Sequence, residues 1–358
     1  MRELRVCLVA SSRFPIAEPF HGGLEAHTAA LARSLVNRGH RVSVFAAAGS
    51  DPDLDVEVLP VEQFEPSDAA RRDVGAPPQA WIQEHHAYLA LMLHLQQHGH
   101  ERFDVVHNNS LHHLPVAMAG SLRVPVVTTL HTPPLAWLES AMAIAPNAST
   151  FAAVSRHTAR AWSHAVDPVV VLNGVDTDRW TPGPGGDRAI WTGRLVPEKA
   201  PHLAIAAARR AGLGLDLAGP VMDRGYVDAE IVPLLGDDVR HLGHLGTPEL
   251  VDAVGRASVA LVSPHWDEPY GLVAAEAMAC GTPVAAFARG ALPELVSERS
   301  GRLARPGDVD DLARAAREAA LLDRSQVRDH AVRHCGIDRM TASYEQLYRS
   351  LLVQGRAA

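Results

Sequence analysis

The sequence predicts an α/β fold built from two doubly wound parallel sheets. Short apolar runs typical of buried strands alternate with helical patterns along most of the 358 residues. One stretch near the middle, residues 173–187, is rich in Pro, Gly and Asp and interrupts this alternation. At this length the chain can form two domains. We therefore predict an N-terminal domain at 1–172, a linker at 173–187, a C-terminal domain at 188–337 and a terminal segment at 338–358.

Composition places the chain among ordinary globular proteins, with a hydrophobic fraction of 47%. The net charge of −8 counts against nucleic acid as the main partner. Three widely spaced cysteines, without a CxxC pair, predict neither a disulfide framework nor a zinc site and fit a reducing compartment. A strand pattern starts at Leu4, which leaves no room for a signal peptide, and no apolar run reaches membrane-spanning length. We expect a cytoplasmic protein without a strong membrane signal.

The chain contains 20 histidines, which are scattered along the sequence. We interpret most of them as surface composition. The adjacent pairs His85–His86 and His112–His113 would point to different faces of a helix. No metal site is predicted.

The N-terminal domain begins with a strand, a glycine loop, a helix and a second strand. The strands are expected at Arg5–Ala10 and Arg41–Ala47, the loop at Ser11–His21 followed by Gly22 and Gly23, and the helix at Leu24–Val36. Doubly wound domains start in this way and place ligands at the carboxyl ends of their strands. Two glycines before a helix allow a phosphate or a sugar to approach the backbone, although a simple turn is the plainer interpretation.

The rest of this domain continues the alternation. Glu65–Pro78 is predicted as a surface loop and Ala80–His98 as a long helix. Ser155 is a suitable N-cap for a helix that runs to about Ala165. The remaining strands are predicted at Val56–Leu59, Phe103–His107, Val126–His131, Phe151–Val154 and Val169–Leu172. Polar residues follow several of these strands, among them His131, which is expected to face the ligand crevice.

The C-terminal domain repeats the pattern. A helix is expected from about Ala200 to Ala211, and another starts at Thr247, with Thr247 as N-cap and Pro248 at the first helical position. Helical sequence runs from Asp308 to the end, with an amphipathic stretch at Met340–Leu352. The strands are predicted at Ala189–Thr192, Leu215–Ala218, Val239–Leu242, Val259–Val262 and Val284–Phe287.

Two carboxylates flank a helix that starts near Gly271. Glu268 lies just before the helix, and Glu276 lies about 7–8 Å along its axis at 1.5 Å per residue. The first-turn amides of such a helix favour an anionic or hydroxyl-rich ligand. Most glutamates are solvated surface charges. Glu276, however, sits in the apolar sequence LVAAEAMA, where an unpaired carboxylate is costly, so it needs a partner such as a ligand hydroxyl.

A second polar motif, GRLVPEK, follows the first strand of the C-terminal domain. It places Arg194 at the end of the strand and Lys199 near the start of the next helix. A guanidinium and an ammonium that converge there would neutralise a diphosphate and stabilise the charge of a leaving nucleotide. An unrelated pair of surface cations is the alternative.

The glutamate-x7-glutamate pattern, GRLVPEK and the Gly-Gly loop together resemble the retaining family 4 of GT-B glycosyltransferases. The resemblance implies two Rossmann-like domains with an interdomain cleft and a final helix that crosses back onto the N-terminal domain. It implies transfer of a sugar from a nucleoside diphosphate donor, with UDP favoured over GDP, to a hydroxyl acceptor. By this resemblance Glu268 contacts the sugar, Glu276 the ribose, and His131 the sugar hydroxyls. The implied catalytic set is Glu268, Arg194, Lys199 and His131, and the implied donor-binding set is Gly22, Gly23, Arg194, Lys199, His244, Leu245, Glu268, Tyr270, Gly271, Leu272 and Glu276.

Several alternatives remain open at this point. The same fold can carry a UDP-sugar 2-epimerase, which needs extra acid–base carboxylates, or a non-catalytic sugar-nucleotide binder. No DxD-type metal site is recognised, since Asp51–Asp53 and Asp53–Asp55 lie in a loop and at the start of a strand. We therefore expect a metal-independent reaction without a cofactor, by same-face displacement. A soluble or small-molecule acceptor is preferred, and the sequence leaves the oligomeric state open.

Overall fold

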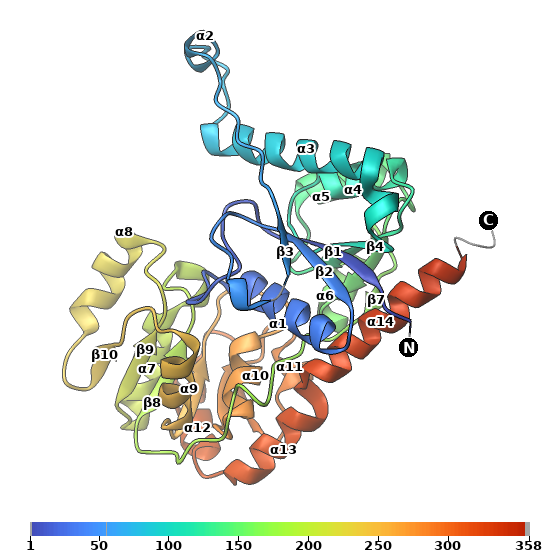
Figure 1. Cartoon of the computed structure of the whole chain (residues 1–358). Coiled ribbons are helices and arrows are strands. Elements are labelled where there is room, and N and C mark those ends of the chain that lie inside the picture. The colour runs from blue at the N-terminus through green and yellow to red at the C-terminus, as the bar shows by residue number, and fades with distance from the viewer. Residues whose placement is uncertain (1, 55, 355–358) are drawn as a thin grey trace.

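The computed structural model of the chain describes residues 2–54 and 56–354. Asp55, which precedes the predicted strand Val56–Leu59, lies outside the described residues. So do residues 355–358 of the predicted terminal segment. The described part forms two parallel-sheet domains of the Rossmann type (Figure 1). The predicted α/β class with two doubly wound sheets is confirmed.

The N-terminal sheet has seven parallel strands in the order β3-β2-β1-β4-β5-β6-β7. Its central strand, β1, pairs with β2 through Val6 and Val42 and with β4 through Val6 and Val105. Successive residues of β1 enter opposite cores. The strands are β1 (Arg5–Val9), β2 (Arg41–Phe45), β3 (Glu57–Leu59), β4 (Val105–Asn108), β5 (Val126–Leu130), β6 (Thr150–Ala153) and β7 (Val169–Val170).

Helices cover both faces of this sheet. Helix α1 and the terminal helix α14 pack on one face, and α3 packs on the other. The helices of this part of the chain are α1 (Gly23–Asn37), α2 (Asp68–Arg71), α3 (Gln79–Arg102), α4 (Leu114–Ala117), α5 (Ala136–Ile144) and α6 (Arg156–Trp162), with short 3₁₀ turns at Pro52–Leu54 and Ala119–Ser121.

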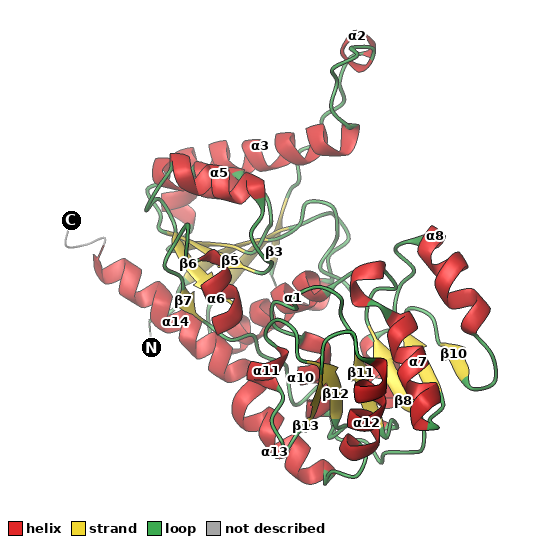
Figure 2. Cartoon of the chain, turned by 180° about the vertical axis from the view of Figure 1, so that it is seen from behind, coloured by secondary structure: helices red, strands yellow, loops and turns green. Residues whose placement is uncertain are grey.

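The C-terminal sheet has six parallel strands in the order β10-β9-β8-β11-β12-β13. Alternate residues of β11 enter the two cores, one formed with α7 and α12 and the other with α9, α10 and α13 (Figure 2). The strands are β8 (Ala189–Thr192), β9 (Leu215–Ala218), β10 (Val239–His241), β11 (Val259–Val262), β12 (Val284–Phe287) and β13 (Gly301–Ala304). The helices are α7 (Pro201–Ala211), α8 (Arg224–Tyr226), α9 (Thr247–Gly255), α10 (Leu272–Ala279), α11 (Leu292–Leu295), α12 (Val309–Ala319) and α13 (Arg324–Cys335), with 3₁₀ turns at Pro197–Lys199 and Val232–Leu234 and a π-helical turn at Val227–Ile231.

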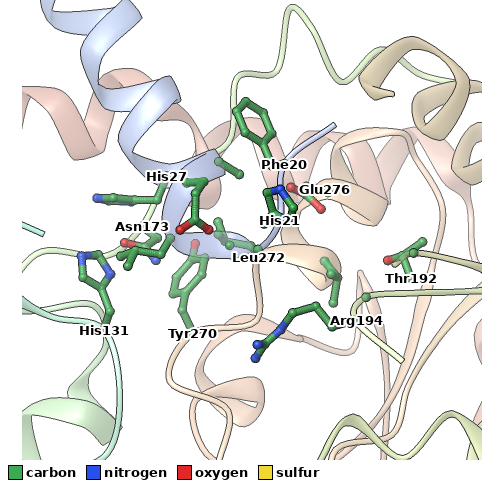
Figure 3. Close-up of a pocket in the computed structure, with 18 of the residues that line it drawn as sticks. Phe20, His21, His27, His131, Asn173, Thr192, Arg194, Tyr270, Leu272 and Glu276 are labelled. Atoms are coloured by element: carbon green, nitrogen blue, oxygen red, sulfur yellow. The ribbon is translucent and has the colours of Figure 1, made fainter. Parts of the chain in front are cut away.

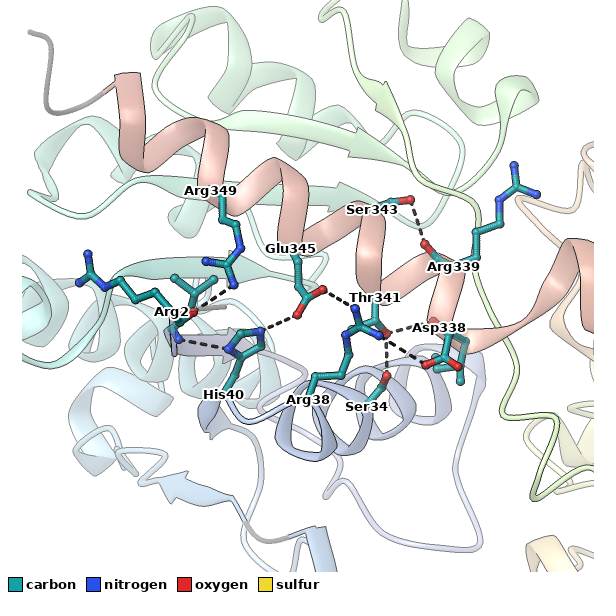
Figure 4. Close-up of polar contacts among 12 residues, drawn as sticks. Arg2, Ser34, Arg38, His40, Asp338, Arg339, Thr341, Ser343, Glu345 and Arg349 are labelled. Atoms are coloured by element: carbon teal, nitrogen blue, oxygen red, sulfur yellow. Dashed lines mark hydrogen bonds and ion pairs between the residues drawn. The ribbon is translucent and has the colours of Figure 1, made fainter.

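The terminal helix α14 (Ile337–Gln354) leaves the C-terminal domain and packs against α1 of the N-terminal domain (Figure 1). Its Met340, Tyr344 and Tyr348 are buried in the N-terminal core. Glu345 contacts both Arg38, at 2.7 Å, and His40, at 2.6 Å (Figure 4). The structure thus joins the two domains twice, through residues 173–187 and through α14.

Several local predictions were wrong. The predicted loop Glu65–Pro78 contains the one-turn helix α2, capped by the Ser67 hydroxyl, at the tip of a projecting arm (Figure 1). Gly246, and not Thr247, is the N-cap of α9. Helix α5 and strand β13 were not predicted. No helix within the described residues has the length and apolar character needed to span a bilayer.

Candidate functional site

A cavity with a volume of about 680 Å³ lies between the two domains. This volume falls in the range of small-molecule sites. Every residue of the predicted catalytic and donor-binding sets lines it, although these residues come from distant parts of the chain: Gly22, Gly23, His131, Arg194, Lys199, His244, Leu245, Glu268, Tyr270, Gly271, Leu272 and Glu276. The structure therefore brings the sequence motifs together around one space.

The start of α10 forms one wall of this cavity. Gly271, its N-cap, has a φ of +95°, which favours glycine. A Cβ at this position would lie 2.8 Å from Cδ2 of Leu292. The amides of the first turn have no acceptor within the helix and sit at the positive end of its dipole. This wall suits the oxygens of an anionic ligand.

Lys199 and Glu268 meet beside this helix start. The Lys199 ammonium lies 2.6 Å from Oε2 of Glu268. The indole N–H of Trp266 donates to the same oxygen at 3.0 Å, and the ammonium lies 4.8 Å from the centre of the Trp266 ring. Trp266 was not among the predicted site residues. The sequence feature that could have indicated Trp266 is its position two residues before Glu268.

Arg194 provides a second cation on the same side of the cavity. Its guanidinium lies 3.7 Å from Glu198, and its side chain is 38% exposed, so it is accessible to a ligand. Across the cavity, Glu25 lies behind Gly22 in the first turn of α1 and is buried. Burial raises the pKa of Glu25, and the charge of Arg194 partly offsets that rise. The electrostatic field of Arg194 therefore reaches the glycine loop.

Glu276 lies one turn inside α10 and faces the cavity (Figure 3). Burial raises the pKa of its carboxyl from 4.5 to about 7. A hydroxyl donor from a ligand would stabilise the ionised form and lower that pKa. This arrangement agrees with the expectation that Glu276 needs a partner from outside the protein.

His131 lies at the end of β5, where its Nε2 contacts Oδ1 of Asn109 at 2.9 Å. Because an amide oxygen only accepts, Nε2 carries the proton and Nδ1 is left as an acceptor. Burial, followed by the charges of His27 and His107, holds the pKa of His131 well below 6.5. His131 is therefore a neutral imidazole at pH 7.

A group of buried polar atoms without hydrogen-bond partners surrounds His131 on the cavity wall. Within the described residues it comprises both ring nitrogens of His27 and Oδ1 of Asn173. Figure 3 shows His27, Asn173 and His131 side by side, with Arg194 on the far side of Tyr270. Buried polar groups rarely stay unpaired, so these atoms mark a place where a ligand with hydroxyl groups is expected. His27 was not predicted as a site residue, because it lies inside an ordinary helical pattern.

The segment with His244 and Leu245, two members of the implied donor-binding set, is bridged to the N-terminal domain. His244 donates from Nε2 to the carbonyl of Phe20 at 3.0 Å. Gly290 lies behind the site, where a Cβ would approach the backbone oxygen of Glu268 to 2.2 Å, and Ala291 donates its amide to that oxygen at 2.8 Å. Gly290 therefore holds the Glu268 loop in position.

Comparison with known proteins places this geometry in a family. Residues 21–179 match the model of Glycosyltransferase Family 4, and residues 180–331 match the model of glycosyl transferases group 1. The D-inositol 3-phosphate glycosyltransferase of Mycolicibacterium smegmatis is 30% identical over an alignment that covers 96% of this chain and 91% of that protein. The chain belongs to glycosyltransferase family 4.

Other relatives of this family 4 chain agree. The glycogen synthase of Mycobacterium tuberculosis is 29% identical, over 83% of this chain and 82% of its own. Among solved structures, AviGT4, a glycosyltransferase of avilamycin A biosynthesis, has a TM-score of 0.73 at 24% identity and covers 98% of both chains. Anabaena HepE, in complex with UDP and glucose, has a TM-score of 0.75 at 20% identity over 97% of this chain and 100% of its own. These structures share the GT-B fold, and the chain is a glycosyltransferase.

Proposed function

We propose that this glycosyltransferase moves a sugar from a nucleoside diphosphate donor, preferably a UDP-sugar, to an acceptor hydroxyl with retention of anomeric configuration. One observation carries the proposal: Arg194, Lys199 and the start of α10 converge on a single cavity together with Glu268 and Glu276. Two cations and a helix dipole match a diphosphate, and the carboxylates match sugar and ribose hydroxyls.

The cation set supports a reaction that does not require a metal. Arg194, Lys199 and the α10 amides would stabilise the diphosphate as it leaves, which is the role that a divalent ion plays in other transferases. The Asp51 carboxylate of the Asp51–Asp53 pair already forms an ion pair with Arg33, 2.8 Å away. A GDP-sugar remains the second donor candidate, because the chemistry of the base region does not separate it from UDP.

Same-face displacement is the proposed route. Glu84, on the N-terminal side of the cavity, is paired with Arg13 at 2.6 Å, and burial raises the pKa of Glu25, whose Oε2 would lie 3.3 Å from a Cβ at Gly22. Neither is placed as a free nucleophile. His131 and the unpartnered groups around it would hold the sugar, with Nδ1 of His131 accepting from a hydroxyl.

The names of the relatives supply two acceptors to test, D-inositol 3-phosphate and glycogen. The assay measures nucleoside diphosphate release from UDP-, GDP-, ADP- and dTDP-sugars in EDTA, with each acceptor and without one. Proton NMR of the product gives the anomeric configuration. The proposal predicts metal-free release from one nucleotide class and a product with the donor's configuration. An inverted product, a trapped glycosyl-enzyme or a strict metal requirement would each contradict part of it.

A further inference from the structure

Three histidines that the donor site does not use come together beside the N-terminal half of the cavity. They are His85 on α3 and His112 and His113 in the loop before α4, and one nitrogen of each lies within 4.8 Å of the others. The rings of His112 and His113 stack at 4.4 Å. The expectation that these two adjacent histidines face apart is wrong, because they lie in a loop and not in a helix. His86 does face away from His85 and stacks on Phe64.

The two loop imidazoles are held in place by aromatic neighbours. His112 stacks on Tyr88 at 4.4 Å, and His113 stacks on Trp137 at 5.0 Å. Tyr88 is itself buried and donates its hydroxyl to the carbonyl of Ala10 at 2.7 Å. The stack of four rings restricts both imidazoles, and these two rings must tilt out of the stack for one nitrogen of each to point at a single ion. His85 stands at the edge of the stack, 6.1 Å from both imidazole rings.

We propose that His85, His112 and His113 form a binding site for a divalent transition metal of the Zn²⁺ type. Three imidazoles with one open position suit zinc, whose bonds to nitrogen of about 2.0–2.1 Å place the ligand atoms roughly 3.3 Å apart. His85 is exposed on α3, so a change of rotamer closes the remaining gap. Imidazole ligands also accommodate Ni²⁺ and Cu²⁺, whereas Mg²⁺ and Ca²⁺ prefer oxygen.

One contact limits the affinity of this site. The amide of Leu114 donates to Nδ1 of His112 at 3.2 Å, which places the ring proton on Nε2. Coordination through either nitrogen gives up this hydrogen bond, since a metal at Nε2 requires the proton to move to Nδ1. We therefore expect reversible binding and not a permanent structural ion.

The metal would cross-link two elements of the cavity wall. It would join α3 to the loop before α4, and Tyr88 and His112 of this cluster also line the cavity. Arg194 and Lys199 come from the C-terminal domain, on the donor side. The inference is thus independent of the donor chemistry and stands whether or not the proposed UDP-sugar reaction is correct.

Zinc binding to the untagged, metal-free full chain tests the proposal. Zn²⁺ is titrated against a chromogenic chelator, and Co²⁺ absorption reports tetrahedral coordination. We expect one equivalent to bind the wild type more tightly than any further zinc, and its affinity should be weakened at least about 10-fold in His85→Ala and His113→Ala, since even supporting groups of a metal site cost that much. His86→Ala is the matched control and should bind like the wild type.

A second control addresses weaker two-histidine sites. His94 and His98 lie one turn apart on α3, with ring centres 5.3 Å apart. His94→Ala should leave the tight equivalent intact. Circular dichroism verifies the fold of each variant, and the exposed His85 makes His85→Ala safe to interpret. Equal zinc affinity in His85→Ala and the wild type, or no tight equivalent in the wild type, would overturn the proposal.

Discussion

The ammonium of Lys199 lies 2.6 Å from Oε2 of Glu268, although the two residues are 69 positions apart in the sequence. The pair links the motif after β8 to the loop before α10. In the absence of ligand, Lys199 neutralises the carboxylate that is proposed to hold the donor sugar. When a diphosphate enters, the same cation has a second anion to neutralise, so the pair connects the sugar and phosphate parts of the site.

Lys199→Ala should therefore impair catalysis more than folding. It removes a charge that stabilises the leaving diphosphate and leaves Glu268 without its cation. We expect kcat/KM to fall roughly 10²–10³-fold, the usual cost of one such stabilising group. Steady-state kinetics with the active donor measures this. Arg210→Ala, which removes an exposed cation paired with Asp310, is the control and should keep full activity. Wild-type kinetics in Lys199→Ala would contradict this role.

Glu276 predicts a pH dependence of stability in the unliganded enzyme. The folded protein holds this proton more tightly than the unfolded chain, with a pKa of about 7 against 4.5. Its contribution to stability is thus present below pH 4.5 and is lost as the pH rises towards 7. Glu276→Gln has no carboxyl to ionise and does not lose stability in this way. The melting temperature of the variant should therefore rise relative to that of the wild type as the pH increases from 4.5 to 7. Calorimetry without ligand checks this, and parallel curves for the two proteins would count against a raised pKa.

His131 should act as a neutral group whose orientation depends on Asn109. Asn109→Ala removes the acceptor that fixes the proton on Nε2, so the imidazole can present the wrong tautomer to the sugar. We expect activity to fall between roughly 10- and 100-fold, the range seen when a positioned group is misplaced. The pH profile of kcat/KM for the wild type should show no titration of His131 near 6.5, because its pKa lies well below that value. The assignment would be refuted if the wild-type profile showed a step near pH 6.5 and the His131→Asn variant lacked that step.

Glu345 should anchor α14 to the N-terminal domain. Burial alone would raise its pKa, but its hydrogen bonds with Arg38 and His40 outweigh burial and hold the pKa below 4.5. Glu345→Ala leaves both partners without their acceptor and should lower the free energy of unfolding by about 2–4 kcal/mol. The stabilisation exists above pH 4.5 and is lost as the pH falls through the lowered pKa, so wild type and variant should converge in acid.

Glu3→Ala, which breaks the exposed pair with Arg41, is the control and should change the free energy of unfolding by less than about 1 kcal/mol. Denaturant melts at neutral and acidic pH compare all three proteins.

The sequence predicted those parts of the molecule that depend on local pattern. Alternation of apolar runs identified most strands, and the spacing of Glu268 and Glu276 placed the first just before α10 and the second on it. Features that depend on contacts between distant segments were not accessible in this way. His27 lies in an ordinary helical pattern, and only the packing of α1 against β5 sets its ring 4.8 Å from that of His131. The stacking of His112 on Tyr88 likewise follows from the fold and not from the sequence of either segment.

Donor binding by the wild type and Arg194→Ala tests the central claim most directly. Nucleotide that binds the folded state raises the melting temperature, and at a fixed concentration it does so more the tighter it binds. With EDTA present, UDP, GDP, ADP and dTDP are compared on both proteins. The account predicts stabilisation of the wild type by one nucleotide, with UDP favoured, and loss of that stabilisation in Arg194→Ala. Equal stabilisation of both proteins, or none by any nucleotide, would contradict the assignment of this cavity as the donor site.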